Sequence, residues 1–292
     1  MRFPLFFDTM ERQFQQEQKK VKRLKIDAHT HIVTGEIKDE YFARTDAYAV
    51  VMPFIGKFKE HGFPDDSFSV AHSDPRLFLS PAIDISGDIP GQLEAIEKIM
   101  DEKVVGLKIY LTYQRGRADD AKMFPIYDFA RAHRLTVTYH TGSCSLVLPS
   151  DGALEDSRAK YIKNVALRWP DVNFVAAHMD DPRFDECIRV MDGVENMFTD
   201  FSGAYEPGTH EGADIEWAIE TFAHAIDQRP DTYKQILYGT DFCPIINLSA
   251  IDEYDYTIEK LFPPGVRDDI YYRNALRAFP KIKDYTEGHK ND

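Results

Sequence analysis

The chain has 292 residues, of which 43% are hydrophobic and 29% charged, a composition that is ordinary for globular proteins and excludes fibrous and disordered classes. Lys and Arg number 35 against 49 Asp and Glu, so the formal net charge is −14. A nucleic-acid-binding protein normally presents a basic face, because phosphate contacts dominate that affinity. The charge therefore disfavours nucleic acids and anionic membranes as partners and leaves a small-molecule substrate as the expectation.

Cysteine usage and the length of apolar runs indicate the cellular compartment in which the protein is expected. The three cysteines Cys144, Cys187 and Cys243 are odd in number and form no CxxC pair, so neither a disulfide framework nor a structural zinc cluster is expected. No apolar run approaches the roughly 18 residues of a membrane-spanning helix. The N-terminal apolar run is broken by Asp8 and lacks a small-residue cleavage site, which argues against a signal peptide. A cytoplasmic protein is the expectation.

The predicted elements alternate along the chain. A polar surface helix at 8–23 precedes the first strand. Apolar and β-branched runs then predict eight strands, at 25–32, 47–55, 76–84, 104–111, 135–142, 172–179, 196–203 and 235–242. Apolar residues at helical spacing predict helices in most of the gaps, at 91–103, 124–134, 158–170 and 214–227.

This alternation, with near-continuous apolar strands, predicts a parallel sheet covered by helices. Eight strand–helix units indicate a closed (β/α)8 TIM barrel in the α/β class rather than an open sheet. No GxGxxG follows the first strand, which argues against a dinucleotide-binding fold. We expect a single domain over 1–292, with an N-terminal helical extension (1–24), barrel strands and helices (25–250) and a C-terminal helical tail (251–292).

Ionisable residues gather at the carboxyl ends of the predicted strands, where such barrels carry their active sites. His29 and His31 end the first strand, and their spacing of two places both side chains on one side. His140 lies near the end of the fifth strand, His178 near the end of the sixth and Asp241 near the end of the eighth.

Each signal is weak when taken alone. Ten histidines would form roughly a third of one HxH pair by chance, and a lone His140 or His178 would be an ordinary hydrogen-bonded core histidine. Asp241 alone would be a loop or capping residue. The joint pattern is informative because burying so many ionisable groups at one end of a barrel is costly without a partner. Imidazole and carboxylate ligands suit a divalent metal ion, zinc above all, and the pattern therefore predicts a metal site.

Lys108, late in the fourth strand, and Tyr110, two residues on, share one side of that strand. Taken alone, Lys108 would be a snorkelling or ion-paired lysine. Further candidates for contact with a substrate are residues near the predicted barrel mouth, namely Tyr110, Arg115, Tyr139, Phe201 and Phe242.

These segments together resemble the amidohydrolase superfamily, in particular the branch that includes aminocarboxymuconate-semialdehyde decarboxylases. The resemblance covers roughly residues 25–280. It rests on the ordered set IDAHTHI (26–32), VTYHTG (137–142), FVAAHMDD (174–181), NMFTDFSG (196–203), LYGTDFCP (237–244) and NALRAF (274–279). The family often has Gly-Gly after the sixth-strand histidine, whereas Asp180 and Asp181 follow Met179 here. The first loop, Val33 to Arg44, is short and carries no evident substrate-binding signature.

The resemblance implies roles for individual residues. His29, His31, His140 and Asp241 would bind one divalent ion, with zinc favoured and manganese, iron or cobalt as alternatives. His178 would act as acid or base beside it, and Asp241 would also accept a proton. Lys108 stands where binuclear relatives carry a carboxylated, metal-bridging lysine. Many relatives are homo-oligomers, so that state is an expectation too.

The expected reaction is hydrolysis of an amide, lactone or ester bond of a small cyclic or aromatic substrate by metal-activated water. Non-oxidative decarboxylation of an aromatic or unsaturated acid is the alternative; it would need a cation for the departing carboxylate, for which Arg115, Arg117 and Lys57 are candidates. A non-catalytic metal-binding or ligand-binding barrel is the third hypothesis.

Overall fold

The computed structural model describes residues 23–56, 62–143, 151–205 and 215–288. The helix expected at 8–23 lies outside these residues except at Arg23, and Lys57 and Cys144 lie outside them as well. Eight parallel strands form the centre: β1 (Ile26–Thr30), β2 (Tyr48–Val51), β3 (Leu77–Leu79), β4 (Gly106–Tyr110), β5 (Thr136–His140), β6 (Phe174–Ala177), β7 (Met197–Asp200) and β8 (Ile236–Leu237).

The strands pair in chain order, β1 to β3 in one sheet and β4 to β8 in another. Three parallel bridges join these sheets, Leu79 to Val104 and Ala82 to Lys108 on one side and Thr30 to Phe242 on the other. The ring is therefore closed, and the predicted (β/α)8 barrel is confirmed. The observed strands are shorter than predicted, because the chain leaves the ladder soon after each apolar core segment.

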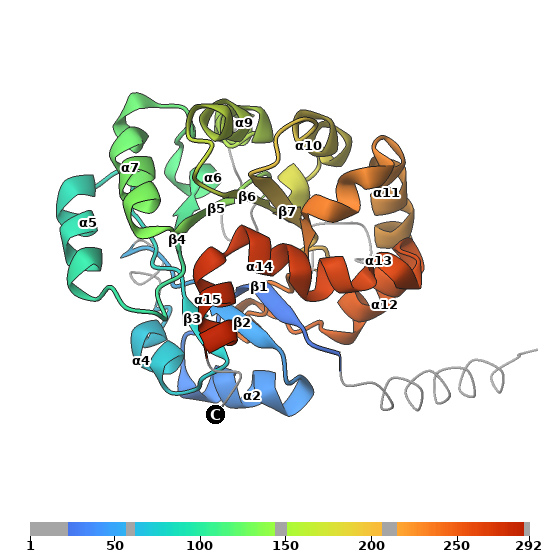
Figure 1. Cartoon of the computed structure of the whole chain (residues 1–292), viewed down its shortest axis with the longest axis horizontal. Coiled ribbons are helices and arrows are strands. Elements are labelled where there is room, and N and C mark those ends of the chain that lie inside the picture. Colours follow the sequence, from blue (N-terminus) through green and yellow to red (C-terminus); the bar gives the residue numbers. More distant parts are fainter. Residues whose placement is uncertain (1–22, 57–61, 144–150, 206–214, 289–292) are drawn as a thin grey trace, which may run out of the picture.

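Helices surround the strands (Figure 1). They are α2 (Gly35–Arg44), α4 (Ser67–His72), α5 (Ile89–Lys98), α6 (Leu111–Gln114), α7 (Phe124–His133), α8 (Asp151–Asp156), α9 (Ala159–Arg168), α10 (Phe184–Val190), α11 (Ile215–Asp227), α12 (Asp252–Leu261), α13 (Pro264–Asp268), α14 (Asn274–Ala278) and α15 (Pro280–Gly288). Short turns η1 (Ala121–Met123), η2 (His178–Asp180), η3 (Pro230–Gln235) and η4 (Pro244–Ile246) and a π-helical turn η5 (Asp269–Arg273) complete the chain. None of the described helices is both long and apolar enough to cross a lipid bilayer.

Local sequence explains several helix boundaries. The Thr34 side chain accepts a hydrogen bond from the Ile37 N–H at the start of α2. Pro residues occupy the first turns of α5 and α7, where a missing N–H costs nothing. The stretch from Val33 to Arg44, expected as a plain loop, is thus largely the helix α2, because this cap and the buried Ile37 and Tyr41 stabilise it.

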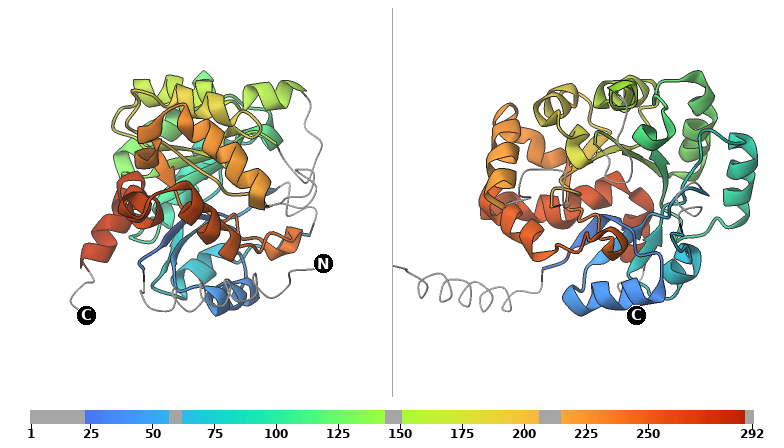
Figure 2. Two further views of the ribbon diagram at one scale, coloured as in Figure 1. Left: turned by 90° about the vertical axis from the view of Figure 1, so that its right-hand side faces the viewer. Right: turned by 180° about the vertical axis from the view of Figure 1, so that it is seen from behind.

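The C-terminal helices close one end of the barrel. Ala275, Ala278, Phe279 and Ile282 of the segment spanning α14 and α15 form a buried cluster with apolar residues from the strands. Asn274 donates to the backbone carbonyl of Ile236, at the start of β8. Figure 2 (left) shows α14 and α15 at one end of the barrel. The carboxyl ends of the strands lie at the other end of the barrel, where the candidate site is found.

Candidate metal centre

The predicted metal ligands and His178 lie on or just after four strands and meet at the carboxyl end of the barrel. His29 lies on β1 and His31 directly follows it; His140 is the last residue of β5. His178 begins the η2 turn after β6. Asp241 was expected at the end of the eighth strand but lies four residues beyond β8, with a left-handed backbone (φ 54°).

His29, His31 and Asp241 form a compact buried group, in which one potential ligand atom from each lies within 4.8 Å of the others. Asp241 Oδ1 is 3.0 Å from His31 Nε2 and 3.3 Å from His29 Nε2. The barrel seam holds this geometry, because the Asp241 N–H donates to the His29 carbonyl and the His31 N–H donates to the Phe242 carbonyl. On its outer side, His31 Nδ1 lies 2.7 Å from the Met52 carbonyl, which leaves Nε2 facing Asp241.

The electrostatics of this group suit a cation. Although burial opposes ionisation, the neighbouring His29 and His31 hold the pKa of Asp241 well below its usual range. Asp241 Oδ1 is buried and has no hydrogen-bond partner among the described residues, even though two imidazole nitrogens face it. A buried carboxylate oxygen of this kind is costly unless a cation or a donor satisfies it. The donor set, two imidazoles and a carboxylate, is one that zinc accepts.

Lys108 lies against the same group. It is fully buried, and its Nζ is 2.9 Å from His29 Nε2. Burial lowers the pKa of Lys108 to about 8 and that of His29 to about 4. Neutral His29 is therefore available as a ligand, and its Nε2 faces both the ammonium and Asp241.

His140, the fourth expected ligand, belongs to neither three-residue group that the geometry identifies among the described residues. Its Nδ1 lies 2.9 Å from His178 Nε2, and its Nε2 lies 2.9 Å from the Ser143 carbonyl. Burial, followed by the neighbouring His178, lowers the pKa of His140 well below its ordinary value. The structure thus pairs His140 with His178 and places three of the four expected ligands together.

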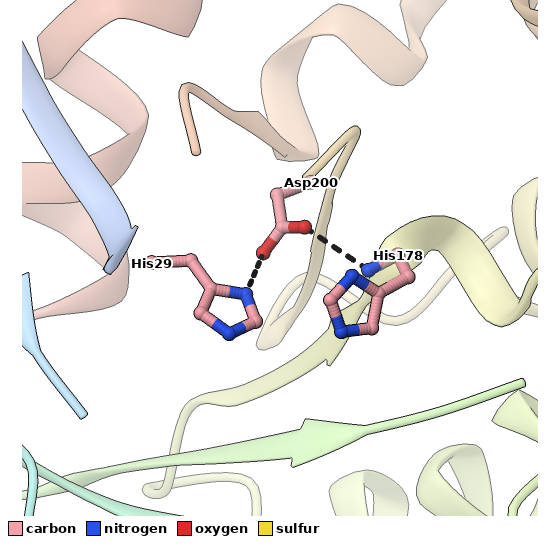
Figure 3. Close-up of side chains that lie close together, drawn as sticks. All are labelled: His29, His178 and Asp200. Carbon is pink, nitrogen blue, oxygen red and sulfur yellow. Dashed lines mark hydrogen bonds and ion pairs between the residues drawn. The ribbon is translucent and has the colours of Figure 1, made fainter. Parts of the chain in front are cut away.

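Two residues at the end of β7 were not among the sequence-based site predictions. Asp200 and Ser202 are both buried, and Asp200 stands between His29 and His178 (Figure 3). One Asp200 oxygen is 3.5 Å from His29 Nδ1, and the other accepts a hydrogen bond of 3.0 Å from the His178 N–H. The available signal was spacing: Asp200 and Ser202 end a strand with the same i, i+2 pattern as His29 and His31.

The expected substrate-contact residues separate into two groups. Tyr110 lies at the site, with its ring 6.4 Å from that of His31 and 6.2 Å from that of His140. Phe54, which was not predicted, stacks on His31 at 4.6 Å. Tyr113, from α6, lies 4.8 Å from the His140 ring. Aromatic rings therefore flank both histidines.

The other four predicted contact residues lie elsewhere. Tyr139 donates its hydroxyl proton to Tyr127 of α7, and Phe201 packs on Phe222 of α11. Phe242 packs on Tyr41 of α2. Tyr139 lies next to His140 on β5, and neighbouring side chains of a strand point to opposite faces. Phe201 and Phe242 lie beyond the ends of β7 and β8, where this alternation no longer applies. Arg115 is an exposed residue that ends α6.

Comparison with known proteins fits this geometry. The sequence model of the amidohydrolase family matches residues 66–281, a region that excludes His29 and His31. A search of curated proteins gives no match.

Solved structures share the fold. A zinc-bound amidohydrolase from Burkholderia multivorans has a TM-score of 0.64 at 16% identity, over 88% of this chain and 99% of that one. A proposed 2-pyrone-4,6-dicarboxylic acid hydrolase from Pseudomonas putida scores 0.59 at 13% identity, over 89% and 99%. A 2,6-dihydroxybenzoate decarboxylase from Rhizobium scores 0.58 at 14% identity, over 88% and 99%. With the family match spanning most of the barrel and the site built at its carboxyl end, the chain belongs to the amidohydrolase family.

Proposed function

We propose that this protein is a metal-dependent hydrolase that cleaves an amide, lactone or ester bond of a small, ring-containing substrate. The observation that carries the proposal is the buried Asp241 oxygen, which faces two imidazole nitrogens and has no hydrogen-bond partner among the described residues. His29, His31 and Asp241 would hold one divalent ion, with His140 as the fourth ligand. Zinc is favoured by the donor set, and manganese, iron and cobalt accept the same atoms.

When bound, the ion would supply Lewis-acid activation of the scissile carbonyl and of a water molecule. The chain's own residues would do the rest. His178 Nδ1 is anchored 2.9 Å from the Ser202 carbonyl, so its Nε2 is the nitrogen that takes up and returns a proton. Asp241 offers a second proton acceptor. The rings of Phe54, Tyr110 and Tyr113 would hold an unsaturated or cyclic substrate against the histidines.

Non-oxidative decarboxylation is the second candidate, because decarboxylases of aromatic acids share this fold. Such a reaction needs a cation that holds the departing carboxylate. In the described part of the chain, Lys108 is buried against His29, Arg115 is exposed, and Arg117 pairs with Asp119. Arg115 is thus open to solvent and Arg117 is paired elsewhere, which supports hydrolysis as the first candidate, while Lys108 is the cation that lies within the site.

Metal content is the first test. Protein purified without chelators should contain about one equivalent of a transition metal per chain by elemental analysis. His29→Ala and Asp241→Ala should lose it, whereas His224→Ala, which removes an exposed histidine of α11, should retain it. Full metal retention in both site variants would refute this ligand set, and two equivalents would bring Lys108 into the site as a carboxylated bridge.

The reaction is tested on the metal-loaded protein with amides and lactones, and in parallel with aromatic carboxylic acids while carbon dioxide release is monitored. Turnover of the former supports hydrolysis. Carbon dioxide release alone would replace it with decarboxylation.

A further inference from the structure

We propose that Ser202 and Asp200 are positioning residues that hold His29 and His178 in the tautomer that carries its proton on Nδ1. No sequence motif pointed to this role. It follows from counting the protons and acceptors in the buried cluster behind the metal centre.

The count starts at Asp200. Asp200 Oδ1 receives the backbone N–H groups of His178 and Ser202, each at 3.0 Å, so this oxygen is an acceptor of hydrogen bonds. Oδ1 accepts from the Ser202 N–H at 3.0 Å and from the Ser202 hydroxyl at 2.5 Å. The one proton of the Ser202 hydroxyl is therefore used on Asp200.

Ser202 Oγ must then act as an acceptor toward its other neighbours. These are His29 Nδ1 at 2.9 Å and His178 Nδ1 at 3.0 Å. A hydroxyl oxygen has two lone pairs, so it can accept from both imidazoles. Each contact requires a proton on the ring nitrogen.

Independent acceptors lead to the same assignment. His178 Nδ1 also lies 2.9 Å from the Ser202 backbone carbonyl, which cannot donate. His29 Nδ1 lies 3.5 Å from Asp200 Oδ2, an oxygen with no hydrogen-bond partner among the described residues. Both rings are thus fixed with Nδ1–H toward β7 and with an unprotonated Nε2 available on the opposite side.

The same three residues, His29, His178 and Asp200, offer ligand atoms within 4.8 Å of one another and so resemble a second cation site. Ser202 decides between the two interpretations. Its Oγ lies within 3.0 Å of an atom of each of the three, so it already satisfies the group that an ion would otherwise join. The geometry favours a hydrogen-bonded support over a second ion.

The consequence rests on the proposed function: His29 Nε2 would be free as a metal ligand and His178 Nε2 as a proton acceptor. Residues that orient a metal-binding histidine in this way typically contribute 10- to 100-fold to metal affinity.

Asp200→Asn gives the sharpest test, because it keeps the shape of the side chain but replaces one acceptor oxygen with a donor NH2 group. In one orientation, the Asn NH2 group would face the three donors that Oδ1 now accepts from, namely the His178 N–H, the Ser202 N–H and the Ser202 hydroxyl. In the other, it would face the Nδ1–H of His29. Donor would meet donor in both orientations, so neither satisfies all the hydrogen bonds of the cluster. Ser202→Ala removes the shared acceptor. The matched control is Ser80→Ala, since Ser80 is buried in the same barrel and its Oγ has no hydrogen-bond partner among the described residues.

Two readouts are measured on each variant: the histidine tautomers, by nitrogen-15 NMR of the imidazoles in metal-free protein, and the zinc Kd, by chelator competition. Wild type and Ser80→Ala should show His29 and His178 protonated on Nδ1. Asp200→Asn should move the His29 proton to Nε2, and both cluster variants should weaken zinc binding about 10- to 100-fold.

Wild-type tautomers in both folded cluster variants would overturn the proposal. If Asp200→Asn does not fold, the zinc Kd of Ser202→Ala decides, because the backbone carbonyl of residue 202 still accepts from His178 in that variant. Zinc affinity equal to wild type in Ser202→Ala would then overturn the proposal. If wild type binds no zinc, the proposed function fails, yet the tautomers of the metal-free protein still decide this inference.

Discussion

His140 and His178 contact each other, and the outer nitrogen of each lies 2.9 Å from a backbone carbonyl, that of Ser143 or of Ser202. Carbonyls only accept hydrogen bonds, so each outer nitrogen carries a proton. The two inner nitrogens therefore face each other as acceptors at 2.9 Å, a contact that becomes a hydrogen bond when one of the two rings takes up a further proton.

We predict that His178→Ala retains the metal but lowers turnover about 10²- to 10⁴-fold, the usual contribution of a positioned acid or base. Metal analysis together with kcat on the substrate found in the screen checks this. His133→Ala, which removes a partly exposed histidine of α7 paired with Glu97, is the control. Unchanged turnover in the His178 variant would assign the proton transfer to another group.

Individual residues differed in how well the sequence predicted them. His29 and His31 were predictable, because two histidines at i and i+2 on a strand end must share a side. Asp200 and Ser202 were not singled out, since either residue is also common in turns. Tyr139, Phe201 and Phe242, expected as substrate contacts, contact Tyr127, Phe222 and Tyr41 respectively. Strand alternation already indicated that Tyr139 and its neighbour His140 on β5 point to opposite faces.

At the scale of elements, the segments that follow β5 and β6 are joined to each other. Thr141 donates through its hydroxyl to the Ala177 carbonyl and accepts from the Asp180 N–H. The Ser143 N–H donates to the Asp181 carbonyl. Because His140 and His178 begin these segments, their contact depends on this connection.

Gly142 lies where the two segments approach each other closely, and its φ is +72°. A Cβ there would lie 2.0 Å from the Asp181 carbonyl oxygen. Gly193 has nearly the same φ, +71°, but open space around it. We expect Gly193→Ala to lower the free energy of unfolding by about 1–2 kcal/mol, the left-handed backbone cost, and Gly142→Ala to lower it well beyond that. Urea denaturation measures both, and equal losses would show that the close approach is not needed.

Asp180 should make stability depend on pH. Burial raises its pKa from 3.8 to about 7; one oxygen accepts from the Ala159 N–H, and Arg183 Nη1 lies 3.8 Å from the other. Between those pH values the folded chain keeps a proton that the unfolded chain loses, so the free energy of unfolding falls as pH rises from about 4 to about 7.

We expect Asp180→Asn to reduce that fall, because its amide does not titrate and Asn tolerates the left-handed φ of 56°. Urea denaturation across this pH range measures the slope, with the exposed Asp192→Asn as control. A slope that stays as in wild type would assign the proton uptake elsewhere. The sequence could not reveal this, since a left-handed run at His178, Met179 and Asp180 has no glycine to announce it.

At the scale of the molecule, stability and chemistry occupy opposite ends of the barrel. The order of strands and helices was predictable because alternation and periodicity are local properties of the sequence. The closing role of α14 and α15 was not, because it depends on where a helical tail returns in space. Thr136 at the start of β5 donates to the Ala278 carbonyl, and Asn173 just before β6 donates to the same carbonyl.

We predict that Phe279→Ala costs about 3–5 kcal/mol of unfolding free energy, the usual loss for a buried phenylalanine, and leaves the metal content unchanged. Denaturation and elemental analysis test the two halves of the statement. Leu167→Ala, which truncates a side chain that is 60% exposed, should cost little. Loss of metal in folded Phe279→Ala would show that the two ends are coupled.

The segment spanning α14 and α15 also affects how the protein folds during its synthesis. Ribosomes make the chain from its N-terminus, so the strands emerge before the residues that cover their lower ends. Until Phe279 and Ile282 have emerged, the strand residues of the buried cluster that they complete lack this part of their cover. The nascent barrel therefore exposes apolar surface of the kind that chaperones bind until this segment docks.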